Sequence, residues 1–269
     1  MIQLKNSDQI KAMKEAGRIT AEALLAAREH VKEGISTKEL DTIIRNYIEH
    51  AGAKPSFLGY AGFPGSACIS LNDEVIHGIP SKKRILREGD IVKIDVGAFY
   101  KGYHGDSART YPVGRVSEEA LALIQATEES FYAGIAAVKP GNRLGDVGNA
   151  IDTLVKSYGF STVKRYVGHG VGRELHEAPD VPNYGTAGRG IRLCSGMTIA
   201  IEPMVNAGVC DVEEMADGWT VKTKDRKLSA HYENTVALTD NGLLLLTEVE
   251  RENFFSQIKL DRRDFSAER

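Results

Sequence analysis

The sequence repeats its own pattern of apolar and glycine residues at one fixed distance. Four residues of the first half have a residue of the same type 107 positions later: Val31 and Val138, Gly34 and Gly141, Ile44 and Ile151, Gly52 and Gly159. Further along, the apolar segment 89–95 falls on the segment 196–202, so that Asp95 corresponds to Glu202. Self-similarity at one period indicates a duplicated unit. The competing interpretation is that two unrelated helix and strand units share common start and stop residues.

Helical periodicity follows the same repeat. Apolar residues recur at helical spacing from residue 7 to about 31, and a second helix begins at Ser36, where Glu39 completes a capping box, and ends at Gly52. Similar patterns predict helices at 117–138 and around 147–155, the last closed by Gly159. Each half therefore opens with a pair of helices.

Apolar segments with strand character follow each helix pair. They cover residues 91–99, 103–113, 198–207 and 232–246, the last interrupted by an Asp240-Asn241-Gly242 turn. We therefore expect an α+β fold with antiparallel sheets flanked by helices. We expect one domain at 1–247, with pseudo-repeats at about 8–113 and 117–246, followed by a tail at 248–269 of mixed charge and little periodicity.

Composition excludes several classes of protein. The 269 residues are 42% hydrophobic and 26% charged, and the formal net charge of -3 provides no broad basic surface for a specific nucleic-acid substrate. Cys68, Cys194 and Cys210 are odd in number and lack CxxC spacing, which argues against a disulfide framework and a structural zinc knuckle. No apolar run approaches the roughly 20 residues that span a bilayer. We expect a cytoplasmic protein without membrane contact.

Two carboxylates, Asp95 and Glu202, interrupt segments whose other residues predict buried strands. A buried carboxylate needs hydrogen bonds, a cationic partner or a metal, so a buried salt bridge is the alternative to a metal site. A hairpin that turns at Tyr100-Lys101 would pair residues whose numbers sum to 201, which places Asp95 directly opposite Asp106. Two carboxylates so close repel each other unless positive charge lies between them.

The second half adds an imidazole and another acid. His169 lies in the glycine-rich segment 168–172, and Glu233 is expected on a strand. Four ionised carboxylates and one imidazole carry a charge that two divalent cations neutralise. A donor set rich in oxygen, with one histidine, suits manganese, iron or cobalt better than zinc, although zinc stays possible.

The residues Asp95, Asp106, His169, Glu202 and Glu233 resemble the five metal ligands of the methionine aminopeptidases, and more closely those of the type I bacterial form. The resemblance extends from the first helix to about Thr247 and includes the segments His77-Gly78-Ile79-Pro80, His104-Gly105-Asp106-Ser107-Ala108-Arg109-Thr110, Gly168-His169-Gly170-Val171-Gly172 and Ile201-Glu202-Pro203. It implies the pita-bread fold with pseudo-two-fold symmetry. It also implies a metal-dependent aminopeptidase, a hydrolase that removes an N-terminal methionine when the next residue is small.

The resemblance also implies individual roles. Asp106 and Glu233 would bridge two divalent ions (Fe2+, Mn2+, Co2+ or Zn2+), Asp95 would chelate one, and His169 and Glu202 would complete the other. A metal-activated water would attack the scissile carbonyl, with Glu202 as general base. His176 would bond the substrate carbonyl or the tetrahedral oxygen, and His77 would contact the peptide near the scissile bond.

The family's apolar methionine pocket matches four positions: Tyr60, Phe63, Cys68 and Trp219. Cys68 is expected to form pocket wall and not to act as a nucleophile. Three residues depart from the usual family pattern: Phe63 replaces a frequent tyrosine, Leu175 a frequent phenylalanine and His231 a glutamine. We expect the first two to alter affinity or penultimate-residue tolerance, and His231 to alter the surroundings of Glu233.

The implied partners are N-terminal methionyl peptides and nascent chains, with transient ribosome contact and a monomeric state. One alternative is an X-Pro aminopeptidase or prolidase-like peptidase of the same fold. Those relatives generally carry a large extra N-terminal domain, which we do not expect here because the first helix starts near residue 8. The other alternative is a non-catalytic binding module of the same fold. Such proteins lose ligands, whereas all five are present in this sequence.

Overall fold

The computed structural model describes residues 2–248, and helices open each half of this chain. They are α1 (Ser7–Arg28), α2 (Thr37–His50), α3 (Glu118–Ala136) and α4 (Leu144–Ser157), with a short 3-10 helix at Tyr60–Gly62. The predicted capping box at Ser36 is confirmed: its hydroxyl accepts from the Glu39 amide, and the Glu39 carboxylate accepts from the Ser36 amide. No helix between residues 2 and 248 is long and apolar enough to cross a membrane.

The described strands pair antiparallel throughout. One sheet has the order β1-β4-β2 (Lys54–Pro55, Ile91–Tyr100, Ala67–Leu71), and β5 (Tyr103–Pro112) also pairs with β4. A second has the order β15-β14-β9-β7-β8 (Gly242–Leu245, Asn234–Thr239, Thr198–Ile201, Gly168–Gly170, Glu177–Val181). Two smaller sheets are β13-β10-β6 (Ser229–His231, Met204–Asn206, Ser161–Thr162) and β11-β12-β3 (Val212–Glu214, Val221–Thr223, Glu74–Ile76).

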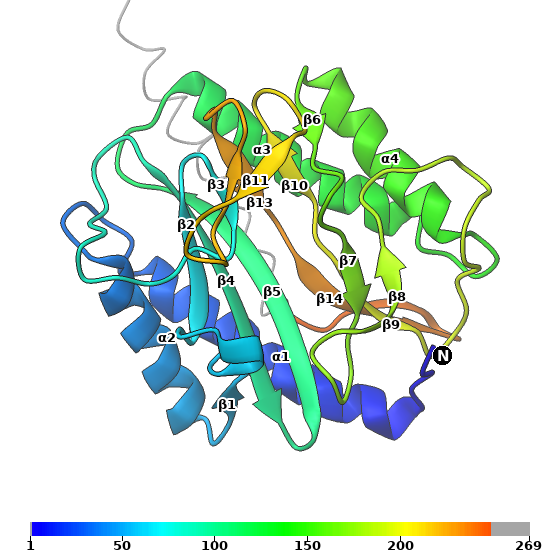
Figure 1. Cartoon of the computed structure of the whole chain (residues 1–269). Coiled ribbons are helices and arrows are strands. Elements are labelled where there is room, and N and C mark those ends of the chain that lie inside the picture. The colour runs from blue at the N-terminus through cyan, green and yellow to red at the C-terminus, as the bar shows by residue number, and fades with distance from the viewer. Residues whose placement is uncertain (1, 249–269) are drawn as a thin grey trace, which may run out of the picture.

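Each helix pair covers its own sheet, and the sheets of the two halves meet between them (Figure 1). One core joins α1 and α2 to β2 and β4, and a second joins α3 and α4 to β9, β10 and β14. The bounds of α2 and α4 differ by 107 at both ends, from 37 to 144 and from 50 to 157, as do the starts of β4 and β9. This arrangement is the predicted α+β fold with antiparallel sheets.

The proposed domain division at 1–247, with pseudo-repeats at about 8–113 and 117–246, stays a prediction. The 107-residue correspondence ends after β10, because β11 and β12 intervene before β13 and β14. The predicted tail at 248–269 lies outside the described residues, except for Glu248.

The predicted hairpin register is wrong by two residues. Tyr100 pairs with Tyr103, so paired numbers sum to 203, and Asp95 lies opposite Ala108, not Asp106. The turn falls on Lys101 and Gly102, which both have positive φ, at 49° and 86°. Two-residue hairpins favour this turn because its twist matches that of the strands. Since side chains alternate along a strand, a shift of two residues leaves both carboxylates on one face of the sheet, diagonal to each other.

The strand predicted at 198–207 is interrupted, and the one predicted from residue 232 begins only at Asn234, at the same level. Glu202 and Pro203 separate β9 from β10, and Tyr232 and Glu233 separate β13 from β14. The flanking pairs are Ile201 with Asn234 and Met204 with His231, so Glu202 lies opposite Glu233. Pro203 has no amide hydrogen to donate to the hydrogen-bond ladder of the sheet, which favours a break in the strand at this residue. Glu233 therefore lies between two strands, whereas the sequence had predicted that it lies on a strand.

Helix α1 approaches β5 at backbone distance. A Cβ atom at Gly105 would lie 2.7 Å from the Gly17 Cα atom, and a Cβ atom at Gly17 would overlap the carbonyl oxygen of Leu246. Both positions therefore require glycine. This close approach fixes the helix against the strand that carries Asp106.

We predict that Gly17→Ala destabilises the protein, although the same change inside an ordinary helix stabilises by about 1 kcal/mol. The added methyl group would displace either the helix or the Leu246 backbone, and such overpacking costs about 1–3 kcal/mol. Chemical denaturation would measure the free energy of unfolding. The exposed Lys14→Ala on the same helix should change it by less than about 0.5 kcal/mol. A Gly17→Ala protein more stable than wild type would contradict the close approach.

Candidate active site

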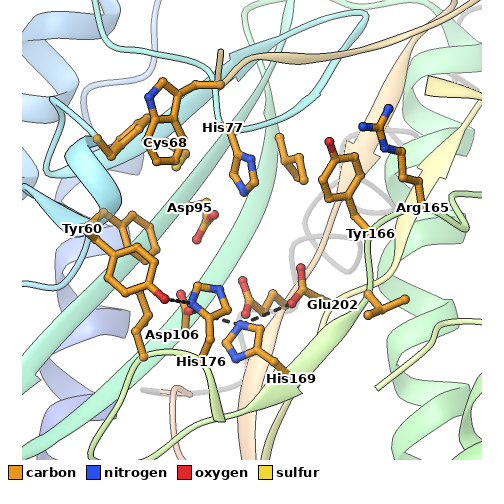
Figure 2. A pocket seen from close by; sticks show the side chains of 17 residues that line it. Tyr60, Cys68, His77, Asp95, Asp106, Arg165, Tyr166, His169, His176 and Glu202 are labelled. Atoms are coloured by element: carbon orange, nitrogen blue, oxygen red, sulfur yellow. Dashed lines mark hydrogen bonds and ion pairs between the residues drawn. The ribbon is translucent and has the colours of Figure 1, made fainter. Parts of the chain in front are cut away.

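Five side chains singled out in the sequence meet in one pocket, although they come from both halves of the chain (Figure 2). They are Asp95 on β4, Asp106 on β5, His169 on β7, Glu202 in the break after β9, and Glu233 in the break before β14. Asp106 and Glu233 are 3% and 2% exposed, and His169 and Glu202 are 8% and 9% exposed. Asp95 is partly buried. Four acids are thus withdrawn from bulk water into one small volume.

Backbone hydrogen bonds across the two halves hold this arrangement. The amide of Ala108 on β5 donates to the Glu233 carbonyl at 3.3 Å, and the Glu233 amide donates back at 2.9 Å. The Arg109 guanidinium donates to the same carbonyl at 2.5 Å and to the Asn234 side-chain oxygen at 2.9 Å. The main chain at Glu233 is therefore fixed from both sides, and its carboxylate projects toward that of Asp106.

The His169 ring points its Nε2 atom at the acids. Nδ1 lies 2.9 Å from the Gly170 carbonyl oxygen, which can only accept, so Nδ1 carries the hydrogen. The Nε2 lone pair then lies 3.5 Å from Glu202 Oε1 and 3.7 Å from Asp106 Oδ2. Donor atoms of Asp106, His169 and Glu233 lie within 4.8 Å of one another, and so do those of Asp95, His231 and Glu233. Glu233 belongs to both groups, as an acid shared by two cations would.

Burial and mutual repulsion disfavour the ionised form of these acids. Burial is the largest cause that raises the pKa of Asp95, Asp106, Glu202 and Glu233. The charge of Asp95 raises the pKa of Asp106 and Glu202 further, and the charge of Asp106 does so for Glu233. The Oδ1 atoms of Asp95 and Asp106 are buried, and neither has a hydrogen-bond partner among residues 2–248. Orphaned carboxylate oxygens in a crowded acidic cluster fit divalent cations well.

The histidines around the acids are neutral near pH 7. Burial lowers the pKa of His169 to about 3 and that of His77 to about 4, and in both cases the charge of His176 lowers it further. Burial also lowers the pKa of His176. A neutral imidazole has one lone pair and one N–H group, so each ring can either ligate a cation or donate one hydrogen bond to a substrate.

The cavity beside the acids has a volume of about 330 Å³ and apolar walls. The four positions matched to a methionine pocket all line it: Tyr60, Phe63, Cys68 and Trp219. The Phe63 and Trp219 rings meet edge to face at 5.1 Å between centroids. Leu175 lies in the same apolar cluster. Burial, followed by the charge of Asp95, raises the pKa of the Cys68 thiol well above its ordinary value, which favours the neutral thiol as part of the apolar wall.

Two further histidines enter the cavity from opposite sides. His77 has φ of 59°, a left-handed conformation that costs a residue with a Cβ atom of order 1–3 kcal/mol. Gly78 follows it and admits no Cβ atom, because the Ile69 backbone occupies that space. His176 lies beside His169, with ring centroids 4.1 Å apart and the rings tilted by 46°, and its Nδ1 lies 2.8 Å from the Tyr60 hydroxyl. Strain and hydrogen bonding thus fix the two rings in place.

Several residues of the site were not predicted from the sequence. Phe57, Arg165 and Tyr166 line the cavity, and the Tyr166 ring meets His77 edge to face at 6.0 Å between centroids. Arg165 and Tyr166 lie just before the glycine-rich segment that carries His169, so their position in the chain was the available signal. His231 was noted only as a departure, yet it joins the acids.

The model of metallopeptidase family M24 matches residues 11–240 of this chain. Methionine aminopeptidase 1 of Bacillus subtilis is 52% identical over 249 residues, which cover 93% of this chain and all of that protein. The crystal structure of a methionine aminopeptidase from Thermotoga maritima superposes with a TM-score of 0.91 at 45% identity and covers 92% of this chain and all of that one.

A prolidase from Pyrococcus furiosus shares the architecture less closely. It superposes with a TM-score of 0.75 at 28% identity, and the match covers 92% of this chain but only 66% of the prolidase. Identity, coverage and structural similarity thus all favour the same group of relatives, and the chain belongs to metallopeptidase family M24 and, within it, to the methionine aminopeptidases.

Proposed function

We propose that this metal-dependent hydrolase removes the N-terminal methionine of peptides and newly made proteins, with preference for a small second residue. The observation that carries this proposal is the placement of four acids and His169 beside a cavity with apolar walls. An unbranched thioether side chain fits a cavity walled by aromatic rings and a thiol. The acids and the wall are close enough together to serve one substrate.

The donor set fits two divalent cations. Asp106 and Glu233 would be shared by both, Asp95 would bind one, and His169 and Glu202 would complete the other. Bound there, the cations would lower the pKa of a water molecule and polarise the scissile carbonyl. The identity of the metal, among Fe2+, Mn2+, Co2+ and Zn2+, is a matter for measurement.

Glu202 is the proposed general base. Its carboxylate lies at the break between β9 and β10, beside the proposed metal site, where it could accept a proton from the attacking water and return it to the leaving amine.

His176 is the proposed donor to the developing oxyanion. Burial, followed by the charges of Glu174 and Asp106, raises the pKa of Tyr60, so its hydroxyl remains protonated and donates to Nδ1 of the neutral His176 ring. The hydrogen of that ring is then on Nε2, where it can stabilise negative charge on the substrate. His77, on the opposite wall, is proposed to contact the peptide near the scissile bond.

We further propose that the protein acts as a monomer on nascent chains in the cytoplasm, with transient contact to the ribosome. This follows from the substrate, because initiator methionine is exposed first on chains that are still being made. The X-Pro peptidase alternative is not favoured, because the match spans only two thirds of the Pyrococcus furiosus prolidase. The non-catalytic alternative is not favoured either, because all five proposed ligands converge in one pocket.

The decisive experiment compares two peptides on metal-stripped protein refilled separately with manganese, iron(II), cobalt or zinc. We expect release of methionine from Met-Ala-Ser only after a metal is added, and no cleavage of Ala-Pro peptides. Cleavage of the Ala-Pro bond would transfer the protein to the proline-specific peptidases. A failure to cleave either peptide with any metal would leave the binding-module interpretation.

Asp106→Asn should abolish metal-dependent hydrolysis while the protein stays folded. The change keeps the side-chain volume and removes one of the buried charges that repel each other, so the melting temperature in EDTA should not fall. The rise in melting temperature that manganese produces should shrink. Asp8→Asn, an exposed acid on α1, is the matched control. Wild-type turnover by Asp106→Asn would refute the shared-ligand role.

His176→Ala should lower kcat about 10²–10³-fold with little change in KM, as expected for loss of an oxyanion donor. Tyr60→Phe should lower kcat about fivefold, because one hydrogen bond worth about 1 kcal/mol no longer fixes the imidazole tautomer. Tyr158→Phe, which removes an exposed hydroxyl bonded to Glu129, should change neither constant. Steady-state kinetics on Met-Ala-Ser would separate the two constants, and an effect on KM alone would assign His176 to ground-state binding.

A further inference from the structure

His231 is the most deeply buried histidine beside the acids, and its ring has no hydrogen-bond partner. The residue is 1% exposed, and within the described chain neither Nδ1 nor Nε2 finds a partner. A buried polar atom without a partner costs about 1–3 kcal/mol. A leucine or phenylalanine would fill the same space without that cost, so the imidazole is retained for a different reason.

The backbone aims this ring at the acids. The Thr110 hydroxyl accepts from the His231 amide at 2.9 Å and donates to the His231 carbonyl at 2.8 Å, which fixes the end of β13 against β5. Nε2 then lies 3.7 Å from Glu202 Oε2 and 3.9 Å from Glu233 Oε2. Both distances are too long for hydrogen bonds. The ring therefore faces two carboxylates without bonding to either.

The spacing suits a cation better than a hydrogen bond. At 3.7 and 3.9 Å, the His231 Nε2 atom is too far from either carboxylate oxygen to share a hydrogen with it. A cation that lies about 2.0–2.2 Å from each of its ligands would fit between these atoms.

The grouping of donor atoms also supports a cation at this position. His231 contributes a nitrogen that lies within 4.8 Å of donor atoms of both Asp95 and Glu233. This set has the same composition as the other group, in which His169 joins Asp106 and Glu233. Two aspartates, two histidines and one shared glutamate thus divide evenly between two sites.

We propose that His231 is a sixth metal ligand, which binds through Nε2 the cation held by Asp95 and Glu233. The proposal rests on the metal centre proposed above. Each of the two cations then has one imidazole ligand, whereas the resemblance implied a single histidine for the pair. A nitrogen donor on this cation favours borderline metals such as iron(II), cobalt or zinc over magnesium or calcium.

Proton NMR of the cobalt(II) protein counts ligating histidines without reference to activity. An imidazole bound through Nε2 keeps its Nδ1 hydrogen, and a nearby paramagnetic ion shifts that exchangeable resonance far outside the normal range. With two cobalt ions bound per chain we expect two such resonances in wild-type protein in water, and neither in deuterium oxide.

Variants assign the two signals. His231→Gln should lose one resonance and keep the other, whereas His169→Gln should lose the one that His231→Gln keeps. The exposed His50→Gln should keep both. Calorimetric titration with cobalt should show at least about tenfold weaker binding of one ion in His231→Gln, since even residues behind the ligands contribute that much. If His231→Gln does not fold, retention of both resonances by His77→Gln and His176→Gln assigns the second signal to His231.

One shifted resonance in wild-type protein with two cobalt ions bound would overturn the proposal and leave the metal centre intact. Unchanged cobalt affinity and two remaining resonances in His231→Gln would do the same. Wild-type protein that binds no cobalt at all would instead refute the metal centre on which the proposed function depends. The two failures are therefore distinguishable in one set of samples.

Discussion

Repulsion among four buried carboxylates is the constraint around which this molecule is built. Asp95, Asp106, Glu202 and Glu233 cannot all be ionised in one small volume unless cations compensate them. A single strand could not carry all four on one face without disrupting its own pairing. The chain distributes them over two halves, on the hairpin β4-β5 in one and at two strand breaks in the other. The antiparallel sheets then bring them together.

The connection between the halves is therefore as important as either half. Backbone bonds between Ala108 and Glu233, and the Arg109 bonds to the same segment, join β5 to the start of β14. The Thr110 hydroxyl extends this connection to His231. The strands that carry the acids and both candidate imidazoles thus belong to one hydrogen-bonded frame. Small shifts of that frame would change the distances between the acids and the imidazoles and, with them, the fit of a bound cation.

Much of this could be read from the sequence, because it depended on local chemistry. Ser36 with Glu39 and the apolar periodicity of the helices each reflect rules that act within one element, and the 107-residue spacing is visible as a repeat in the sequence itself. The hairpin register could not be read, since it depends on which two residues adopt positive φ, and Gly102 placed the turn one residue later than expected. The breaks at Glu202 and Glu233 depend on pairing between distant strands, and so does the placement of Tyr166 at the cavity and of His231 beside the acids.

The glycine contact of α1 has a consequence for how the protein is made. The Leu246 carbonyl lies against Gly17, so helix α1 packs against one of the last described residues of the chain. Glu233 also lies near that end. During synthesis the first helix pair can form early. The acid cluster, however, requires Glu233, and the contact that positions α1 requires Leu246. Folding that waits for such distant contacts is slow compared with local helix formation. The newly made chain thus completes its acid cluster late, after most of its residues have been made.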